Sequence, residues 1–284
     1  MEPSPLLFIG LVTHPKTRFK TSQTVNGVAR RLEAELRSKG INASTTICAE
    51  NLCDYTIGRY TAAQSKIAQR AASIHWHYYL LKQSAPIYKA AAVFIKSLAE
   101  ATKDFFSSKA QTATRRLINI ELAHLSLMQR ALETRASWAI IIEDDATCEN
   151  IEDLADGILG IIGSSHKPSY INLSLSFTPE QLNADRLLTI DPNCTWNGST
   201  LRSIMRASLP ITNTVCAVAY EANFLRDLLN IMEEMGPFPV LPIDWKLNMA
   251  LIKLHRSQFL LQRYKGCLFV EPGPLIQGSL HPIP

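Results

Sequence analysis

Three consecutive carboxylates, Glu143, Asp144 and Asp145, follow an apolar run that begins at Trp138. Residues 140–142 are three isoleucines in succession, and such a β-branched run predicts a strand buried on both faces, as in the middle of a parallel sheet. Open α/β sheets bind ligands beyond the carboxyl ends of their strands, so the acids are expected where ligands bind. Because adjacent carboxylates repel one another, the cluster favours a hard divalent cation, Mg²⁺ or Mn²⁺, which often bridges to phosphates.

The same acids also fit a purely structural role. Residues 151–162 form the next helix-like segment, and negative charge near the first turn of a helix is favourable. The local pattern therefore leaves a metal site and an acidic turn as alternatives.

The N-terminal elements needed to position such a site follow the order strand, loop, helix, strand. Residues 6–12 are apolar, and the helix expected over residues 22–39 has apolar residues at helical spacing and ends at Gly40. Residues 41–47 form a second strand candidate. This order predicts the start of a doubly wound α/β sheet that binds a nucleotide.

Residues 61–112 differ in composition from the rest of the chain. They are rich in Ala, Lys, Gln and Leu with interleaved aromatic residues, and Pro86 separates two expected helices. We interpret them as a helical insertion within a single domain of residues 1–284. The insertion could cover the core, bind an acceptor, or lie against a membrane surface through its Lys and aromatic side chains.

The remaining elements alternate between helices and short strands. The pattern predicts helices over residues 114–134, 151–162, 221–235 and 245–254, and strands over residues 138–142, 170–175, 214–220 and 267–270. Prolines predict a loop over residues 236–242, and the C-terminal tail is rich in turn residues.

Composition restricts the class of protein. The chain has 284 residues, 46% of them hydrophobic, and a net charge of +4 that is not collected into blocks of basic residues. Nucleic-acid binding therefore receives no support. We expect a cytoplasmic location, because no apolar segment is long enough to span a bilayer and the N-terminus lacks the basic start of a secretion signal. The six scattered cysteines are expected to be thiols.

The order of the central elements resembles a family of glycosyltransferases. Residues 119–126 (Asn-Ile-Glu-Leu-Ala-His-Leu-Ser) lie in a helix, and the strand that follows it ends in Glu-Asp-Asp-Ala at residues 143–146. This order is similar to the family that includes bacterial lipooligosaccharide galactosyltransferases and procollagen galactosyltransferases. The resemblance is good over residues 115–146 and weaker at residues 242–248 and 274–279. It implies an α/β, GT-A-like, Rossmann-type nucleotide-diphospho-sugar transferase fold that carries the helical insertion.

The resemblance also implies a function. Enzymes of this kind are metal-dependent glycosyltransferases (hexosyltransferases) that move a sugar from a nucleotide-sugar donor, here most readily a UDP-sugar, to a hydroxyl of a glycan or lipid-linked acceptor, as in polysaccharide biosynthesis. Asp145 and His281 would hold Mn²⁺ or Mg²⁺, which acts as a Lewis acid on the leaving diphosphate. Glu143 and Asp144 would contact the donor.

Asp244 resembles the catalytic base of inverting enzymes of this fold. It lies in a Pro-Ile-Asp-Trp segment, and a base there would take the proton of the acceptor hydroxyl. Trp245 could stack on a sugar face. Because Asp is also a favoured helix N-cap, a structural role for Asp244 stays open.

Two loops are expected to supply the other donor contacts. Thr13, His14 and Arg18 follow the first strand, where the base and diphosphate would lie, and an Arg side chain matches phosphate oxygens. Gln277 and Ser279 belong to a tail that would close over the donor and exclude water.

Other classes of protein fit the sequence less well. No GxGxxG or P-loop motif is present, which disfavours a dinucleotide enzyme or an ATPase. The alternative that we retain is a nucleotide-sugar-binding relative without catalytic activity. The presence of both Asp145 and Asp244 favours the enzyme.

Overall fold

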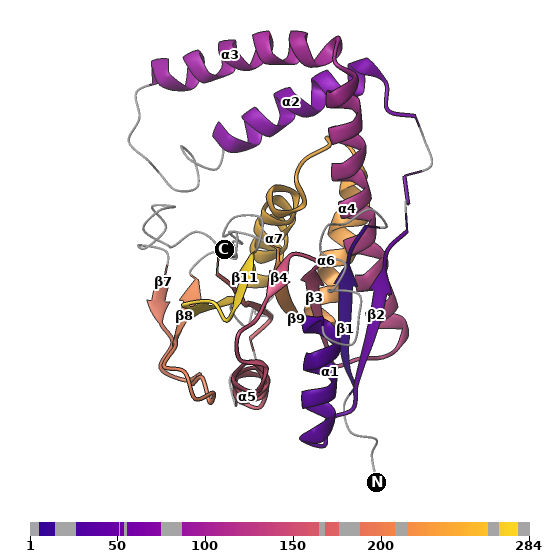
Figure 1. Cartoon of the computed structure of the whole chain (residues 1–284). Coiled ribbons are helices and arrows are strands. Elements are labelled where there is room, and N and C mark those ends of the chain that lie inside the picture. The colour runs from indigo at the N-terminus through magenta and orange to yellow at the C-terminus, as the bar shows by residue number, and fades with distance from the viewer. Residues whose placement is uncertain are drawn as a thin grey trace.

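The computed structural model describes residues 6–14, 27–50, 52–53, 56–74, 87–164, 168–175, 188–207, 215–260 and 267–277. Within these residues an eight-stranded sheet forms the centre, in the order β2-β1-β3-β9-β5-β10-β8-β7 (Figure 1). The strands are β1 (Leu7–Val12), β2 (Ala43–Cys48), β3 (Trp138–Glu143), β5 (Tyr170–Asn172), β7 (Leu188–Ile190), β8 (Ser203–Ala207), β9 (Ala217–Glu221) and β10 (Cys267–Glu271).

The sheet is mixed rather than parallel throughout. β1 pairs in parallel with β2 and β3, and β10 pairs in parallel with β5. β9 runs antiparallel to both β3 and β5, and β8 runs antiparallel to β10 and β7. The molecule is therefore an α/β protein, as the sequence predicted.

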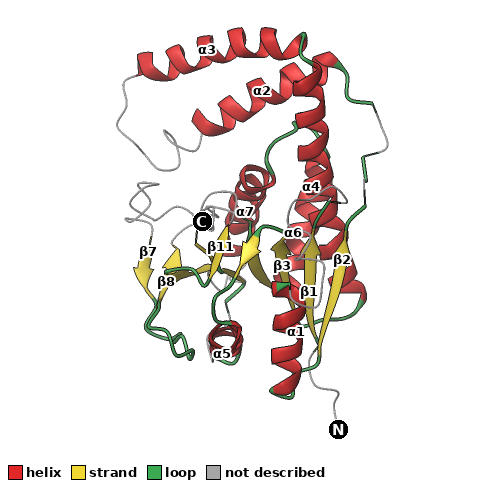
Figure 2. Cartoon of the chain, viewed as in Figure 1, coloured by secondary structure: helices red, strands yellow, loops and turns green. Residues whose placement is uncertain are grey.

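Helices cover both faces of this sheet. Helices α1 (Val28–Ser38) and α5 (Ile151–Ile162) pack on one face, while α4 (Ser108–Glu133), α6 (Ala222–Met235) and α7 (Ile243–Leu260) pack on the other (Figure 2). Helices on both faces of a mixed sheet are compatible with a Rossmann-like fold.

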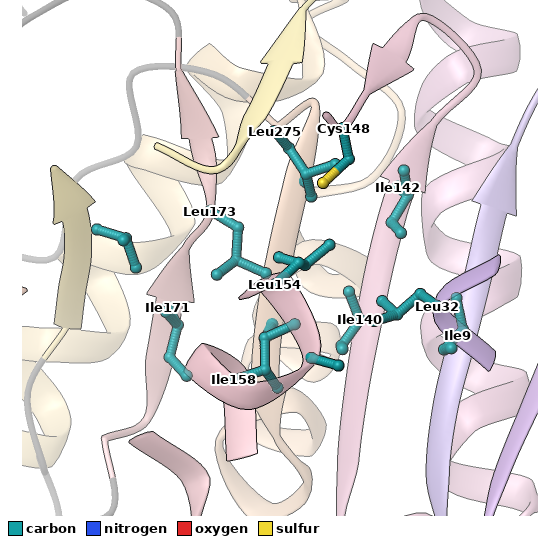
Figure 3. Close-up of a cluster of buried hydrophobic side chains, with 14 of the residues drawn as sticks. Ile9, Leu32, Ile140, Ile142, Cys148, Leu154, Ile158, Ile171, Leu173 and Leu275 are labelled. Carbon is teal, nitrogen blue, oxygen red and sulfur yellow. The ribbon is translucent and has the colours of Figure 1, made fainter. Parts of the chain in front are cut away.

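The alternation of side chains along β3 explains why two cores form. Ile140 and Ile142 point into the cluster beneath α1 and α5, beside Leu32 and Leu154 (Figure 3). Ile141 points to the opposite face and packs in the cluster beneath α4, α6 and α7. Burial of each such side chain stabilises the fold by about 1.5–3 kcal/mol, so a strand of this composition is most stable between two layers of helices.

A second, three-stranded sheet lies beside the first. It consists of β4 (Ala146–Thr147), β11 (Leu275–Gln277) and β6 (Ser174–Leu175), with β11 in the middle. The backbone N–H of Leu275 donates to the carbonyl of Leu173, which ties the small sheet to the end of β5. The C-terminal tail is thus brought next to the segment that follows β3.

Helices α2 (Arg59–Ile74) and α3 (Ile87–Phe105) form a hairpin away from the sheet. They lie beyond the end toward which β1 and β3 point, and α3 is the outermost element (Figure 1). The Ser65 hydroxyl of α2 donates to the Val240 carbonyl at 3.0 Å. Together with contacts to α4, this bond attaches the hairpin to the loop before α7.

Several expectations differ from the structure in detail. Helix α4 begins at Ser108, six residues before the expected start, because the Ser107 hydroxyl caps it by accepting from Ala110 N–H at 3.3 Å. Helix α7 is longer at both ends than predicted. The short strands β4, β7, β8 and β11 were not predicted.

Other expectations concern the cysteines and the membrane. Cys48, Cys53, Cys148, Cys194 and Cys216 are buried thiols, as predicted. Among the described residues, no helix combines the length and the apolar character that crossing a bilayer requires.

Candidate functional site

The candidate site lies at the carboxyl ends of β1 and β3. β1 lies between β2 and β3 in the sheet. The connection from β1 to β2 passes through α1 on one face of the sheet. The chain reaches β3 through α4 on the opposite face. The connections therefore diverge between β1 and β3, and such a switch point is where open α/β sheets bind ligands. Thr13 follows β1, and the three acids begin with the last residue of β3.

The three adjacent carboxylates have three different partners. The Thr13 hydroxyl donates to Asp144 Oδ2 at 2.9 Å, which links the ends of β1 and β3. Glu143 Oε1 lies 3.3 Å from Nε2 of His124 on α4. Asp145 is buried, and its Oδ1 lies 4.0 Å from the Cys216 thiol. Because each carboxylate is directed to a different partner, the repulsion among the three adjacent acids is smaller than their order in the sequence implies.

The thiol beside these acids is affected by them. Burial raises the pKa of Cys216 well above its usual value, and the negative charges of Glu143, Asp145 and Asp144 raise it further. Cys216 is therefore a neutral thiol at ordinary pH, not a thiolate nucleophile.

Asp244 stands in the first turn of α7 near Glu143 and His124. The pKa of Asp244 is raised to about 6, mainly because burial removes solvent from its carboxylate. The negative charge of Glu143 raises this pKa further, whereas a backbone hydrogen bond from Trp245 lowers it. A carboxylate that titrates near neutral pH has the proton affinity that general base catalysis uses. It lies inside the helix rather than at the N-cap position.

A buried ion pair holds α7 against α4 close to Asp244 and His124 in the sequence. Lys246 Nζ donates to Glu121 Oε1 at 2.5 Å and to the Gly236 carbonyl at 2.5 Å. Lys246 is fully buried. Burial raises the pKa of Glu121, although the charge of Lys246 and its hydrogen bond act in the opposite direction. Because Glu121 is one turn from His124 and Lys246 is two residues from Asp244, the pair fixes the distance between the site residues of the two helices.

Other residues expected at the site lie at different distances from it. Gln277 pairs with Ala146 across β11 and β4, so the structure brings it beside the acid cluster. Trp245 is half-buried and packs against the core beneath α4, α6 and α7. His14 is exposed directly after Thr13. Three further expected residues, Arg18, Ser279 and His281, lie outside the described residues.

The donor atoms can be tested against the expected divalent cation. Among the described residues, no group of three or more His, Cys, Asp or Glu side chains converges on one point. Nucleotide-associated Mg²⁺ needs only one or two carboxylates, because phosphates and water complete its coordination. The oxygen atoms at the end of β3 fit an ion that arrives with a diphosphate, and Asp145 is the described residue that would hold it.

The structure places further residues near the site, for which no role was predicted. His124 is buried, and its Nδ1 has no hydrogen-bond partner among the described residues. The Glu121–Lys246 pair was equally unexpected. Glu121 and His124 had two sequence signals: they belong to the segment of residues 119–126 that carries the family resemblance, and their spacing places both on one face of a helix.

Comparison with known proteins gives no family for this chain. No protein-family model matches it, and no curated protein matches it significantly.

Proposed function

We propose that this protein is a metal-dependent glycosyltransferase, a hexosyltransferase with a GT-A-like fold. The observation that carries the proposal is Asp244, whose pKa is raised to about 6 at the end of the sheet where β1 and β3 diverge. The mixed α/β sheet with helices on both faces is compatible with such a fold.

Asp244 acts as the base of an inverting transfer. Its carboxylate accepts the proton of an acceptor hydroxyl while the hydroxyl oxygen forms a bond to the anomeric carbon of the donor sugar. The bond from that carbon to the diphosphate oxygen breaks, and its electron pair leaves with the nucleoside diphosphate. The acceptor is a glycan or a lipid-linked sugar, and a UDP-sugar is the first donor to test.

The acid cluster and the two loops bind the donor. Asp145, with His281, would hold Mn²⁺ or Mg²⁺, and the ion supplies Lewis-acid stabilisation of the leaving diphosphate. Glu143 and Asp144 face the donor, and the hydrogen bond from Thr13 orients Asp144. The remaining contacts come from His14 and Arg18 in the loop after β1, from Gln277 at the end of β11, and from Ser279 in the tail.

Ligand-dependent thermal stability tests the proposal. UDP-, GDP-, CMP- and dTDP-sugars are compared with and without Mn²⁺ in a thermal-shift assay. At a ligand concentration of about 100 times Kd, binding should add about 2.7 kcal/mol of stability and raise Tm by about 5 °C. We expect this for one nucleotide class, UDP first, and only with Mn²⁺.

Two matched variants sharpen that experiment. Asp145→Asn keeps the size of the side chain and should abolish the Mn²⁺-dependent shift, whereas Asp156→Asn, at a surface ion pair with Lys39, should leave it intact. Absence of a manganese-dependent shift with all four nucleotide classes contradicts the proposal. Binding without sugar transfer to any acceptor favours the non-catalytic relative instead.

A further inference from the structure

The outer face of α3 is apolar and exposed. Ile95 is 66% exposed, Leu98 45% and Phe94 43%. Three exposed alanines, Ala91, Ala92 and Ala99, extend the same face. Single exposed apolar residues are ordinary, but a continuous apolar face of this kind marks an interaction surface.

The inner face of α3 is already occupied. Ser97 and Ala101 are buried in the hairpin. Glu100 is directed toward α2, where its Oε2 lies 3.1 Å from Arg70 Nη2 and 3.6 Å from Lys66 Nζ. The carboxylate of Glu100 is therefore neutralised within the hairpin and does not face outward.

Positive charge borders the apolar face. Lys96 and Lys103 are exposed and lie two helical turns apart, so they share one side of α3 next to the apolar residues. Residues 59–105 contain seven Lys and Arg residues against two acids, although the whole chain has a net charge of only +4. This segment therefore carries a clear excess of positive charge.

We infer that the outer face of α3 docks on an anionic lipid bilayer. An interfacial helix of this type inserts its apolar side at the level of the headgroups while its lysines contact anionic lipids. The site at the end of the sheet does not contribute to this binding, so the inference is independent of the proposed sugar transfer.

The charge on this face argues against a second copy of the chain as its occupant. Two copies meeting through α3 would bring Lys96 and Lys103 of both copies together. The acids of α3, Glu100 and Asp104, are only partly exposed, and Glu100 already pairs with α2. An anionic surface, in contrast, satisfies both the lysines and the apolar side chains.

Co-sedimentation with lipid vesicles tests the inference on the full-length chain. We expect binding to vesicles rich in phosphatidylglycerol and little binding to phosphatidylcholine alone. Ile95→Glu combined with Leu98→Glu should weaken binding about tenfold or more. Lys96→Gln and Lys103→Gln should each weaken it about fivefold.

Matched controls use the same substitutions elsewhere. Leu201→Glu changes a side chain that is 96% exposed, and Lys253→Gln changes a surface lysine paired with Glu234. Neither should alter vesicle binding. Binding that is absent, or unchanged by the α3 variants, overturns the inference. A dimer in sedimentation equilibrium that dissociates in the Ile95→Glu, Leu98→Glu variant also overturns the inference, because a second copy would then cover the face.

Discussion

The raised pKa of Asp244, a half-buried residue, lowers the stability of the fold near neutral pH. Its carboxyl group titrates near pH 6 in the native state, whereas Asp in an unfolded chain titrates near pH 4. Between about pH 4 and pH 6 the native state therefore binds more protons than the unfolded state. Stability must fall as pH rises through this window, because the raised pKa reverses the usual behaviour of a carboxylate.

Asp244→Asn removes this dependence. At pH 7 the variant should be about 1–2 kcal/mol more stable than the wild type, a value reduced to allow for the partial exposure of the side chain. Below about pH 4 the two proteins should have equal stability. Urea unfolding at a series of pH values measures the difference, with Asp156→Asn as the control.

The same variant also tests the proposed chemistry. Loss of a general base lowers turnover about 10²- to 10⁴-fold, so Asp244→Asn should be both more stable and less active. A variant that is less stable than the wild type at pH 7 would show that Asp244 serves the helix start instead.

At the scale of elements, the sequence predicted those with strong local signals. The helix at residues 151–162 was predicted with both ends correct, because the apolar spacing is regular and Asn150 caps it by accepting from Asp153 N–H at 3.0 Å. β3 was equally clear from its isoleucines. β4 and β11 have two and three residues, and strands of that length carry no periodicity.

The site was predictable only in part. Short sequence segments pointed to the acid cluster and to Asp244 as site residues. These segments did not indicate which side chains the site residues contact. Pairings between distant segments, such as Glu143 with His124 or Glu121 with Lys246, arise from tertiary packing and leave no local pattern. Gln277 was expected near the site, and the pairing of β11 with β4 brings it beside the acid cluster.

The Glu121–Lys246 pair should determine how firmly α7 is held. Lys246→Met leaves Glu121 buried without its cation, and removal of one partner from such a pair costs about 3–5 kcal/mol. The double variant with Glu121→Gln should recover much of that loss, because no unpaired charge remains. Urea unfolding provides the measurement.

Lys253 provides a matched control on the same helix. Its side chain is 54% exposed and pairs with Glu234 at the surface, so Lys253→Met should change stability by less than about 1 kcal/mol. Equal losses for Lys246→Met and Lys253→Met would contradict the structural role of the buried pair.

At the scale of the whole molecule, the hairpin and the candidate site lie at the same end. The bond from Ser65 to Val240 joins α2 to the loop that delivers Asp244. If α3 rests on a bilayer, the ends of β1 and β3 face that bilayer (Figure 1). A lipid-linked acceptor would then approach Asp244 from the membrane, which links the inferred surface to the proposed reaction.

The attachment of the hairpin also predicts how the molecule opens. α3 packs mainly against α2 and α4, whereas β3 is paired on both sides and covered on both faces. Amides of α3 should therefore exchange with solvent through local opening that is insensitive to urea, and amides of β3 only through global unfolding. Native-state hydrogen exchange at increasing urea concentrations measures both.

Helix α5 serves as the internal comparison for this experiment. It is also a surface helix, but it inserts Leu154, Ile158 and Ile161 into the core, so its amides should exchange with those of the sheet. Anionic vesicles should slow exchange in α3 and leave α5 unchanged, because only α3 carries the exposed apolar face. Equal opening free energies for α3 and β3, with the same urea dependence, would mean that the hairpin and the sheet unfold as one unit. In that case α3 would not open separately from the sheet when it meets a membrane.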